Sequence, residues 1–107
     1  MDKAIEGIRD EIVRRVRRVA DPDRIILFGS AATGQMTRDS DIDLLILMPR
    51  CENTRHESVR IRRALGNLGY PMDVIVMESG RYDQEKNIVG GLAYPVSRTG
   101  TTLFASQ

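Results

Sequence analysis

Apolar residues near the start of the chain recur every three or four positions. The residues that follow this spacing are Ile5, Ile8, Ile12, Val13, Val16 and Val19. The pattern is typical of a helix with one apolar face, and it predicts a helix over residues 3–20. Acidic residues come mostly early in this segment and arginines late, which suits the helix dipole. We expect Asp21 and Pro22 to end the helix, because a residue before proline disfavours helical geometry.

Short apolar runs follow along the rest of the chain. They predict strands over residues 24–28, 42–48 and 72–77, and an edge strand over 101–104. Further helices are expected over 30–33, from Asn53 or Thr54 to Leu68, and from Gln84 to about Val96. This order of elements predicts an α/β (α+β) fold, with a mixed β-sheet and flanking helices, in a single domain covering residues 1–107.

Polar residues at the strand boundaries constrain the sheet further. Gly29 and Ser30 follow the first strand, Asp41 and Asp43 lie at the start of the second, and Asp73 lies at the start of the third. If these residues meet at one site, the first two strands run antiparallel and the second and third run parallel. A parallel pair needs a crossover, and the helix expected before Leu68 is long enough to supply it.

Three carboxylates in this pattern suit divalent metal ions. Asp41 and Asp43 point to the same face of a strand, because side chains alternate along it. Two carboxylates held close repel, and Mg²⁺ relieves that repulsion while keeping positions for water and substrate phosphates. Asp73, expected to be buried among apolar neighbours, completes a set able to hold two ions. For the Asp41/Asp43 pair taken alone, a solvated strand edge is an equally good explanation.

Gly29 and Ser30 are candidates for binding phosphate. Glycine lets the backbone approach a ligand closely, and serine offers a hydroxyl and a backbone N–H. When the pair is taken alone, an ordinary tight turn is the better explanation of it. The segment is not a Walker loop, because it lacks Gly-Lys-Ser/Thr at this point.

The combined pattern resembles the minimal nucleotidyltransferase domains of the DNA polymerase beta-like superfamily. Their mark is a Gly-Ser turn, a ten-residue spacer, Asp-x-Asp and a third acid on a later strand. The matching residues are Gly29, Ser30, Asp41, Asp43 and Asp73, and the run from Ser40 to Leu45 is especially close to that of the family.

The resemblance implies a function as well as a fold. By it, Asp41, Asp43 and Asp73 hold two Mg²⁺ ions, with Mn²⁺ as an alternative, and Asp73 helps to activate the attacking hydroxyl. Gly29 and Ser30 hold the triphosphate of ATP. Family members of this size are often antitoxins that attach AMP to a tyrosine of a HEPN toxin, so we expect such a toxin as partner in a hetero-oligomer.

Departures from the family pattern keep alternatives open, and one of these departures is Arg38 in place of the usual proline before the acidic run. The family commonly has arginines just after Gly-Ser, where this chain has Ala31 and Thr33, and Arg38 is a candidate to replace their charge. A binding module that neutralises its partner by occlusion is therefore one alternative. A second is a nucleotidyltransferase acting on a small molecule, as aminoglycoside-modifying enzymes do, but the chain is short for building an acceptor pocket by itself.

Charge and composition indicate which partners and which cellular compartment to expect. The net charge of the 107 residues is +1, so no broad basic field is available and direct nucleic-acid binding is not expected. The single cysteine, Cys51, suits a reducing compartment. The apolar runs are too short to cross a bilayer, and we expect a cytoplasmic protein without membrane contact.

Overall fold

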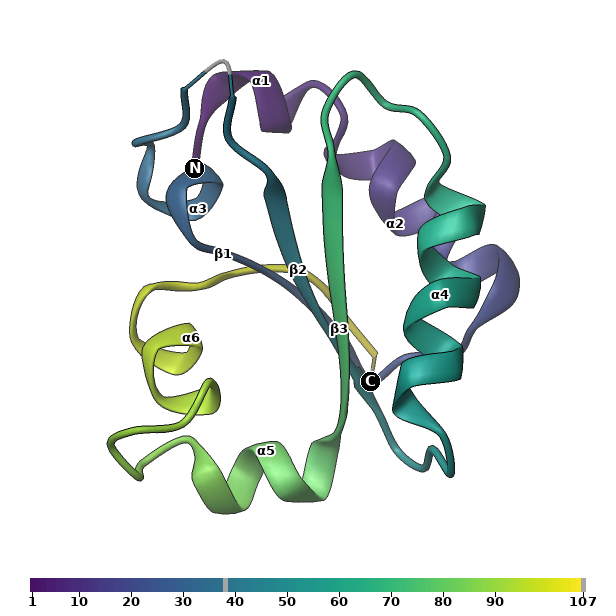
Figure 1. Ribbon diagram of the computed structural model, residues 1–107, viewed down its shortest axis with the longest axis vertical. Helices are drawn as coiled ribbons and strands as arrows, with labels where there is room; N and C mark the ends of the chain where they lie inside the picture. Colours follow the sequence, from purple (N-terminus) through teal and green to yellow (C-terminus); the bar gives the residue numbers. More distant parts are fainter. Residues whose placement is uncertain (38, 107) are drawn as a thin grey trace.

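Four strands form one mixed β-sheet (Figure 1). The computed structural model describes residues 1–37 and 39–106. Within them the strands are β1 (Arg24–Phe28), β2 (Ile42–Met48), β3 (Met72–Glu78) and β4 (Thr101–Ala105). Their order across the sheet is β3-β2-β1-β4. Each agrees with a predicted strand to within one residue at either end.

The strand directions are those that the candidate site requires. β1 pairs antiparallel with β2 and β4, whereas β2 pairs parallel with β3. Helix α4 (Thr54–Leu65) makes the crossover between the parallel strands. The side chain of Asn53 caps its start by accepting a hydrogen bond from the backbone N–H of His56 at 3.0 Å. The predicted mixed sheet with flanking helices is confirmed.

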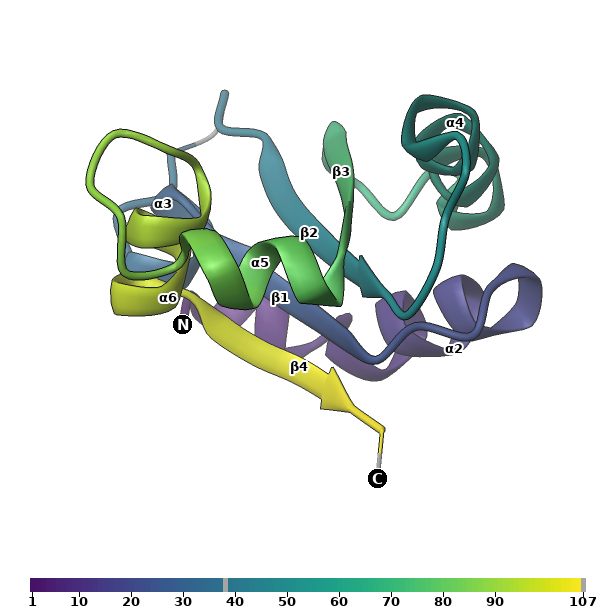
Figure 2. The same ribbon diagram turned by 90° about the horizontal axis from the view of Figure 1, so that it is seen from below.

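Helices cover both faces of the sheet (Figure 2). α2 (Arg9–Val19) and α4 lie on one face, and α5 (Ser79–Glu85) and α6 (Ala93–Thr99) lie on the other. Because side chains alternate along a strand, each face buries its own set of apolar residues. Ile25, Leu27, Leu44 and Ile46 are buried towards α2 and α4, and Ile26, Leu45, Leu47 and Met77 towards α5 and α6.

The single helix predicted over residues 3–20 is wrong, because this segment holds two helices. α1 spans Lys3–Glu6, and α2 begins only at Arg9. Gly7 lies at the break. Glycine is a poor helix former, so the periodic apolar pattern runs across a point where the backbone is free to change direction.

The start of the chain is bonded to the segment after β1. That segment forms α3 (Ser30–Thr33), the short helix that the sequence predicts there. The backbone N–H of Asp2 donates to the carbonyl oxygen of Ala31 at 3.0 Å. The Asp2 carboxylate also accepts a hydrogen bond from the backbone N–H of Ala4 at 2.9 Å, so one residue caps α1 and holds it beside α3.

The helix predicted from Gln84 to Val96 is also wrong. α5 ends at Glu85, α6 begins at Ala93, and residues 86–92 connect them without helical structure. Gly90 has φ +111°, which no helix accommodates. α4 likewise stops at Leu65 rather than at Leu68, since Gly66 has φ +58°. Within residues 1–37 and 39–106 no helix has the length and apolar character needed to cross a membrane.

Candidate active site

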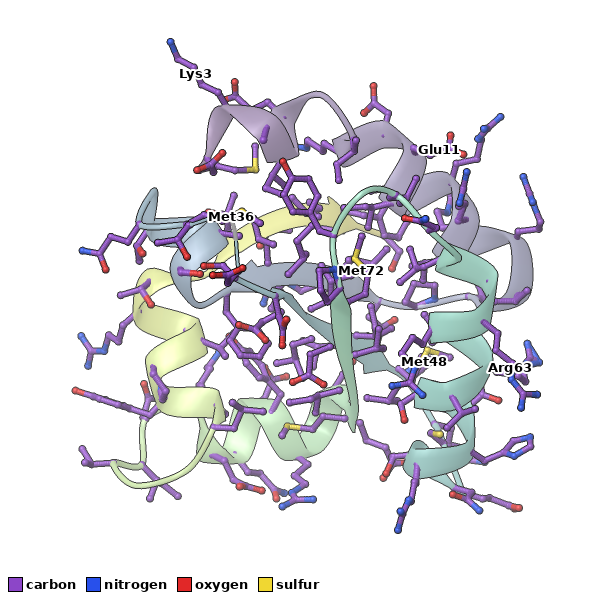
Figure 3. The ribbon with its side chains drawn as sticks, turned by 45° about the horizontal axis from the view of Figure 1, so that its top comes forward. Lys3, Glu11, Met36, Met48, Arg63 and Met72 are labelled. Carbon is purple, nitrogen blue, oxygen red and sulfur yellow. The ribbon has the colours of Figure 1, made fainter. Side chains whose placement is uncertain are left out.

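The register of the sheet brings two of the predicted acids side by side. Asp43 of β2 is the partner of Asp73 in the parallel pair with β3. On its other side Asp43 is the partner of Phe28, the last residue of β1. Neighbouring strands lie about 4.8 Å apart, and register partners project their side chains to the same face. Asp43 therefore lies between the start of β3 and the end of β1, at the end of the sheet where Figure 3 labels Met72.

Burial of the three acids differs from the expectation. Asp41 and Asp73 are exposed, and only Asp43 is half-buried. The expectation that Asp73 lies buried among apolar neighbours is wrong, because β3 is an outer strand and Asp73 lies next to its open first end. The apolar residues on either side of Asp73 point to the opposite face, where Val74 packs in the core.

Electrostatics show that the three carboxylates share one region. The pKa of Asp43 is raised above its ordinary value, chiefly because burial removes water from the charged form. Repulsion by the Asp73 and Asp41 carboxylates adds to this rise. Asp43 thus feels the charge of both other acids, and its own negative charge is unfavourable unless a cation compensates it.

Gly29 passes directly against the Asp43 carboxylate. Its backbone has φ +73° and ψ −154°, a region that is essentially restricted to glycine. A Cβ built on Gly29 would overlap Oδ2 of Asp43. The sequence expectation of a close backbone approach is therefore met in the fold, and only glycine fits between the end of β1 and the acids.

Ser30 follows at the first position of α3 and is half-buried. Within the described parts of the chain its hydroxyl and backbone N–H form no hydrogen bond, whereas its carbonyl accepts the N–H of Gln35 at 3.0 Å. Ala31 is fully buried, so an arginine at this position would displace the core. Thr33 is exposed, and Arg38, the candidate for replacing the missing charge, lies outside the described residues.

The carboxylate oxygens of Asp41, Asp43 and Asp73 suit a divalent cation, although they do not form a preassembled metal site. Among residues 1–37 and 39–106, no group of three or more His, Cys, Asp or Glu side chains has the geometry to hold a metal ion. Repulsion between the Asp43 carboxylate and those of Asp41 and Asp73 favours conformations in which the oxygens stay apart. The carboxylate oxygens beside Gly29 are nevertheless of the type that Mg²⁺ prefers as ligands.

Two arginines that face β3 from α4 were not among the site residues predicted from the sequence. Arg55 and Arg62 of α4 line a cavity together with Asp73. They are seven residues apart, which places both on one side of the helix. That spacing is the signal in the sequence, and it becomes informative only once α4 is known to lie against β3.

Comparison with known proteins decides the family. Residues 5–92 match the model of the nucleotidyltransferase domain family. The chain belongs to this nucleotidyltransferase family. The predicted enzyme class is confirmed at this level, and no curated protein matches the sequence.

Solved structures show that the nucleotidyltransferase fold extends over nearly the whole chain. A crystal structure of a toxin-antitoxin with AMP-PNP is similar with a TM-score of 0.70 and 22% identity, covering 92% of this chain and 74% of that chain. A mutant of the toxin-antitoxin MntA-HpeT gives 0.69 and 20%, with the same coverage of 92% and 74%. A tri-AMPylated Shewanella oneidensis HEPN toxin in complex with an MNT antitoxin gives 0.64 and 18%, covering 95% and 73%. The match to the family model confirms the expected nucleotidyltransferase family, and the solved structures confirm the expected fold.

Proposed function

We propose that this domain transfers AMP from ATP to a tyrosine hydroxyl of a HEPN-type toxin and thereby acts as its antitoxin. The observation that carries the proposal is the alignment of Gly29, Asp43 and Asp73 across three neighbouring strand ends. A glycine loop beside paired carboxylates suits both substrates of a nucleotidyl transfer. The loop can contact the phosphates of the nucleotide, and the carboxylates can contact the attacking hydroxyl.

Each residue has a distinct role in the proposed reaction. Gly29 gives the triphosphate room to approach the backbone, and the hydroxyl and N–H of Ser30 donate hydrogen bonds to its oxygens. Asp73, on the outer strand, accepts the proton of the acceptor hydroxyl as that oxygen attacks the α-phosphorus. Pyrophosphate leaves on the side of Gly29 and Ser30.

Asp41, Asp43 and Asp73 would hold the metal ions, two Mg²⁺ or alternatively Mn²⁺. When bound, these ions would neutralise charge on the reacting phosphates and lower the repulsion between the carboxylates. The raised pKa of Asp43 supports this role, because a group whose charge is unfavourable in the free protein gains most from a bound cation.

Proteins of similar fold support the choice of partner and acceptor. One is an MNT antitoxin in complex with a tri-AMPylated HEPN toxin, and another is a toxin-antitoxin with AMP-PNP. By analogy with these proteins, we propose that this chain forms a hetero-oligomer with a HEPN toxin and that its nucleotide is ATP. We take residues 1–107 to act as one domain, and the pair to act in the cytoplasm, which suits the unpaired Cys51.

A binding module without catalysis is the second candidate. Thr33 favours it, because this exposed position next to the glycine loop lacks the arginine common in the family. Ala31 does not favour it, because its burial makes it part of the core. The two candidates differ in whether neutralisation of the toxin depends on the acids.

Transfer of label from ATP tests the proposal. The chain is incubated with Mg²⁺, ATP labelled in the α-phosphate, and the HEPN-type protein encoded beside it. We expect label on the partner, and loss of label with Asp41→Asn or Asp43→Asn. Asp21→Asn is the control, because Asp21 is exposed and lies before β1, at the opposite end of this strand from Gly29. Neutralisation that survives both site variants without transfer of label would favour the binding module.

Thermal melts test the nucleotide site independently of the partner. A ligand that binds only the folded state at about 100 times its Kd stabilises it by about 2.7 kcal/mol. Mg²⁺ with a nonhydrolysable ATP analogue should therefore raise the Tm of the wild-type chain by several degrees and leave that of Asp43→Asn unchanged. An unchanged wild-type Tm at millimolar analogue would contradict the proposed site.

A further inference from the structure

Two neighbouring aliphatic side chains lie in solvent on the connection between α5 and α6. Ile88 is 59% exposed and Val89 is 77% exposed, and no other large hydrophobic side chain of residues 1–37 and 39–106 is exposed. Single exposed aliphatic residues are ordinary on a protein surface, but an adjacent pair marks a candidate contact surface when all the others are covered. We call Ile88 and Val89 the apolar tip.

Contacts at both ends of the connection hold the apolar tip in its exposed position. The backbone N–H of Ile88 donates to the carbonyl oxygen of Glu85 at 3.0 Å. The hydroxyl of Ser97 in α6 donates to the carbonyl oxygen of Lys86 at 3.1 Å. At the other end, Leu92 is half-buried and packs against the core between the sheet and these two helices. The exposure of the tip is therefore a property of the folded chain.

The apolar tip lies on the side of the sheet that carries the candidate active site. Side chains alternate along a strand, so Asp43 and its register partner Asp73 project to the same face as Leu45. Leu45 is buried towards α5 and α6, whereas α2 and α4 cover the opposite face. Figure 2 shows α2 and the connection between α5 and α6 on opposite sides of the sheet. An acceptor that reaches Asp73 therefore approaches on the same side as the tip.

Half-buried apolar residues link the tip to the acids. Leu92 of the connection, Phe28 of β1 and Ile75 of β3 all pack against one buried cluster. Phe28 is the register partner of Asp43, and Ile75 lies two residues beyond Asp73 on the same face of β3. The molecule measures 33 × 30 × 25 Å. A standard interface buries about 800 Å² on each partner, so one protein can cover both the tip and the acids.

Charges around the apolar tip cancel. Residues 79–92 carry two basic and two acidic side chains. These side chains pair with each other, Arg81 with Glu85 at 2.5 Å and Lys86 with Asp83 at 3.5 Å. Nucleic acids and anionic membranes are attracted by basic side chains that are free of acidic neighbours. A neutral surface with two exposed aliphatic side chains suits instead an apolar patch on another protein.

We propose that Ile88 and Val89 are the anchor with which this domain docks an apolar patch of the HEPN-type partner, so that the acceptor tyrosine of the partner reaches Asp73. This inference rests on the proposed function and names the surface that brings the two proteins together. Burying aliphatic side chains on association is favourable in proportion to the apolar area removed from water. Aliphatic side chains take no part in the bond changes of the transfer, so Ile88 and Val89 are docking residues rather than catalytic ones.

Calorimetric titration with the HEPN-type partner tests the docking without requiring turnover. The double variant Ile88→Ser with Val89→Ser should bind the partner about tenfold or more weakly, because two aliphatic side chains no longer leave water on association. Asn87→Ser is the matched control, since Asn87 is an exposed polar residue of the same connection, and it should bind as the wild type does. Equal affinities of the double variant and the wild type, or no binding by the wild type, would overturn the inference.

Hydrogen exchange maps the contact independently of substitutions. In the part of the chain that the structure describes, the backbone N–H groups of residues 89–91 donate no hydrogen bond. They should therefore exchange fast in the free chain and slowly in the complex with the partner. Exchange at these residues that stays fast in a saturated complex would show that the partner docks elsewhere.

Two further measurements identify other occupants of the apolar tip. In analytical ultracentrifugation we expect the chain alone to be monomeric. If it formed dimers that the double variant abolished without loss of affinity for the partner, the tip would bind a second copy and the inference would be wrong. Sedimentation of the wild type, but not of the double variant, with phosphatidylcholine vesicles would assign the tip to a membrane and would also overturn the inference.

Kinetics with the HEPN-type partner separate this inference from the proposed function. The double variant should raise the KM for the partner by about tenfold and leave kcat and the KM for ATP unchanged. A loss of kcat at saturating partner instead would place Ile88 and Val89 at the reacting groups and contradict a docking role. If the wild-type chain transfers no label, the proposed function fails, and the calorimetric titration alone decides whether the tip docks the partner.

Discussion

The contact between Gly29 and Asp43 sets the tolerance of the site to substitution. The sequence identified both residues through the spacing of Gly-Ser and Asp-x-Asp, because strands that begin and end with these motifs bring them together. The sequence did not reveal that Asp73 is exposed, because the apolar neighbours of Asp73 in the sequence have side chains that point to the other face of β3. Register is a property of the paired strands, and only the structure supplies it.

Gly29→Ala should destabilise the fold and abolish transfer. The backbone conformation alone costs about 1–3 kcal/mol for a residue with a Cβ, and the new methyl group would also displace the Asp43 carboxylate. Gly34→Ala is the control, because Gly34 also has positive φ, +77°, but its Cβ would meet no atom within 4 Å. Urea unfolding of both variants should show a larger loss for Gly29→Ala. Equal losses with retained activity would rule out a close approach at Gly29.

Asp43→Asn should stabilise the protein in the absence of metal. Because the pKa of Asp43 is raised by burial, and by repulsion from Asp73 and Asp41, the folded state holds this proton more tightly than the unfolded chain. The stability of the wild-type chain therefore falls as pH rises through the folded pKa, and the Asn variant avoids this loss.

Thermal melts in a chelator measure this difference. We expect the Tm of Asp43→Asn to exceed that of the wild type by a few degrees at about pH 7, and the difference to vanish at about pH 3, where the carboxylate is protonated in both states. A variant that is less stable than the wild type at neutral pH would mean that the Asp43 carboxylate supports the fold.

At the scale of elements, strands were predicted better than helices. Each apolar run is bounded by polar or turn residues, and these boundaries mark the strands to within one residue. The helix predictions at 3–20 and 84–96 were wrong because apolar periodicity continues through Gly7 and through Gly90, where the backbone does not continue as a helix. Periodicity reports which face is buried, and it does not report whether one helix or two present that face.

Two glycines test how tightly α5 and α6 pack against the sheet. Gly80 lies within α5, and Gly100 follows α6. Gly100 lies at the end of α6, and a Cβ there would meet the carbonyl oxygen of Val96 at 2.5 Å and Cγ2 of Ile26 at 2.8 Å. Gly100→Ala should therefore destabilise the fold by about 1–3 kcal/mol through overpacking. Gly80→Ala should instead stabilise it by about 0.4–1 kcal/mol, because Gly80 lies within α5 with free space around it. Chemical denaturation of both variants measures the two signs, and a stable Gly100→Ala variant would show that α6 can move away from β1.

Across the whole molecule, charge is divided between the two sides of the sheet. Helices α2 and α4 carry nine of the 16 lysines and arginines but only three of the 15 acidic residues. The two helices pack together, and Arg15 and Arg60 donate to backbone carbonyl oxygens of the opposite helix, those of Leu65 and Val19. The net charge of +1 conceals this division. The arginines cluster in the sequence, but only the packing of α2 against α4 shows that the clusters form one basic layer.

This division predicts how association with the partner responds to salt. If an acidic surface of the proposed partner docks against α2 and α4, the association rate should fall by about tenfold or more between low and high ionic strength, while the dissociation rate changes less. Stopped-flow binding of the HEPN-type partner at several concentrations of NaCl measures both rates. An association rate that is independent of salt would mean that the basic layer does not guide the encounter.

The hydrogen bond between Asp2 and Ala31 has a practical consequence for anyone who purifies this protein. A purification handle fused ahead of Met1 would emerge beside the turn that follows β1, where it would compete for space with an incoming nucleotide. A handle placed after the last residue would extend from the far end of β4, clear of that turn. Assays that compare the two fusions, each before and after proteolytic removal of the handle, would separate inactivity of the enzyme from obstruction by the tag.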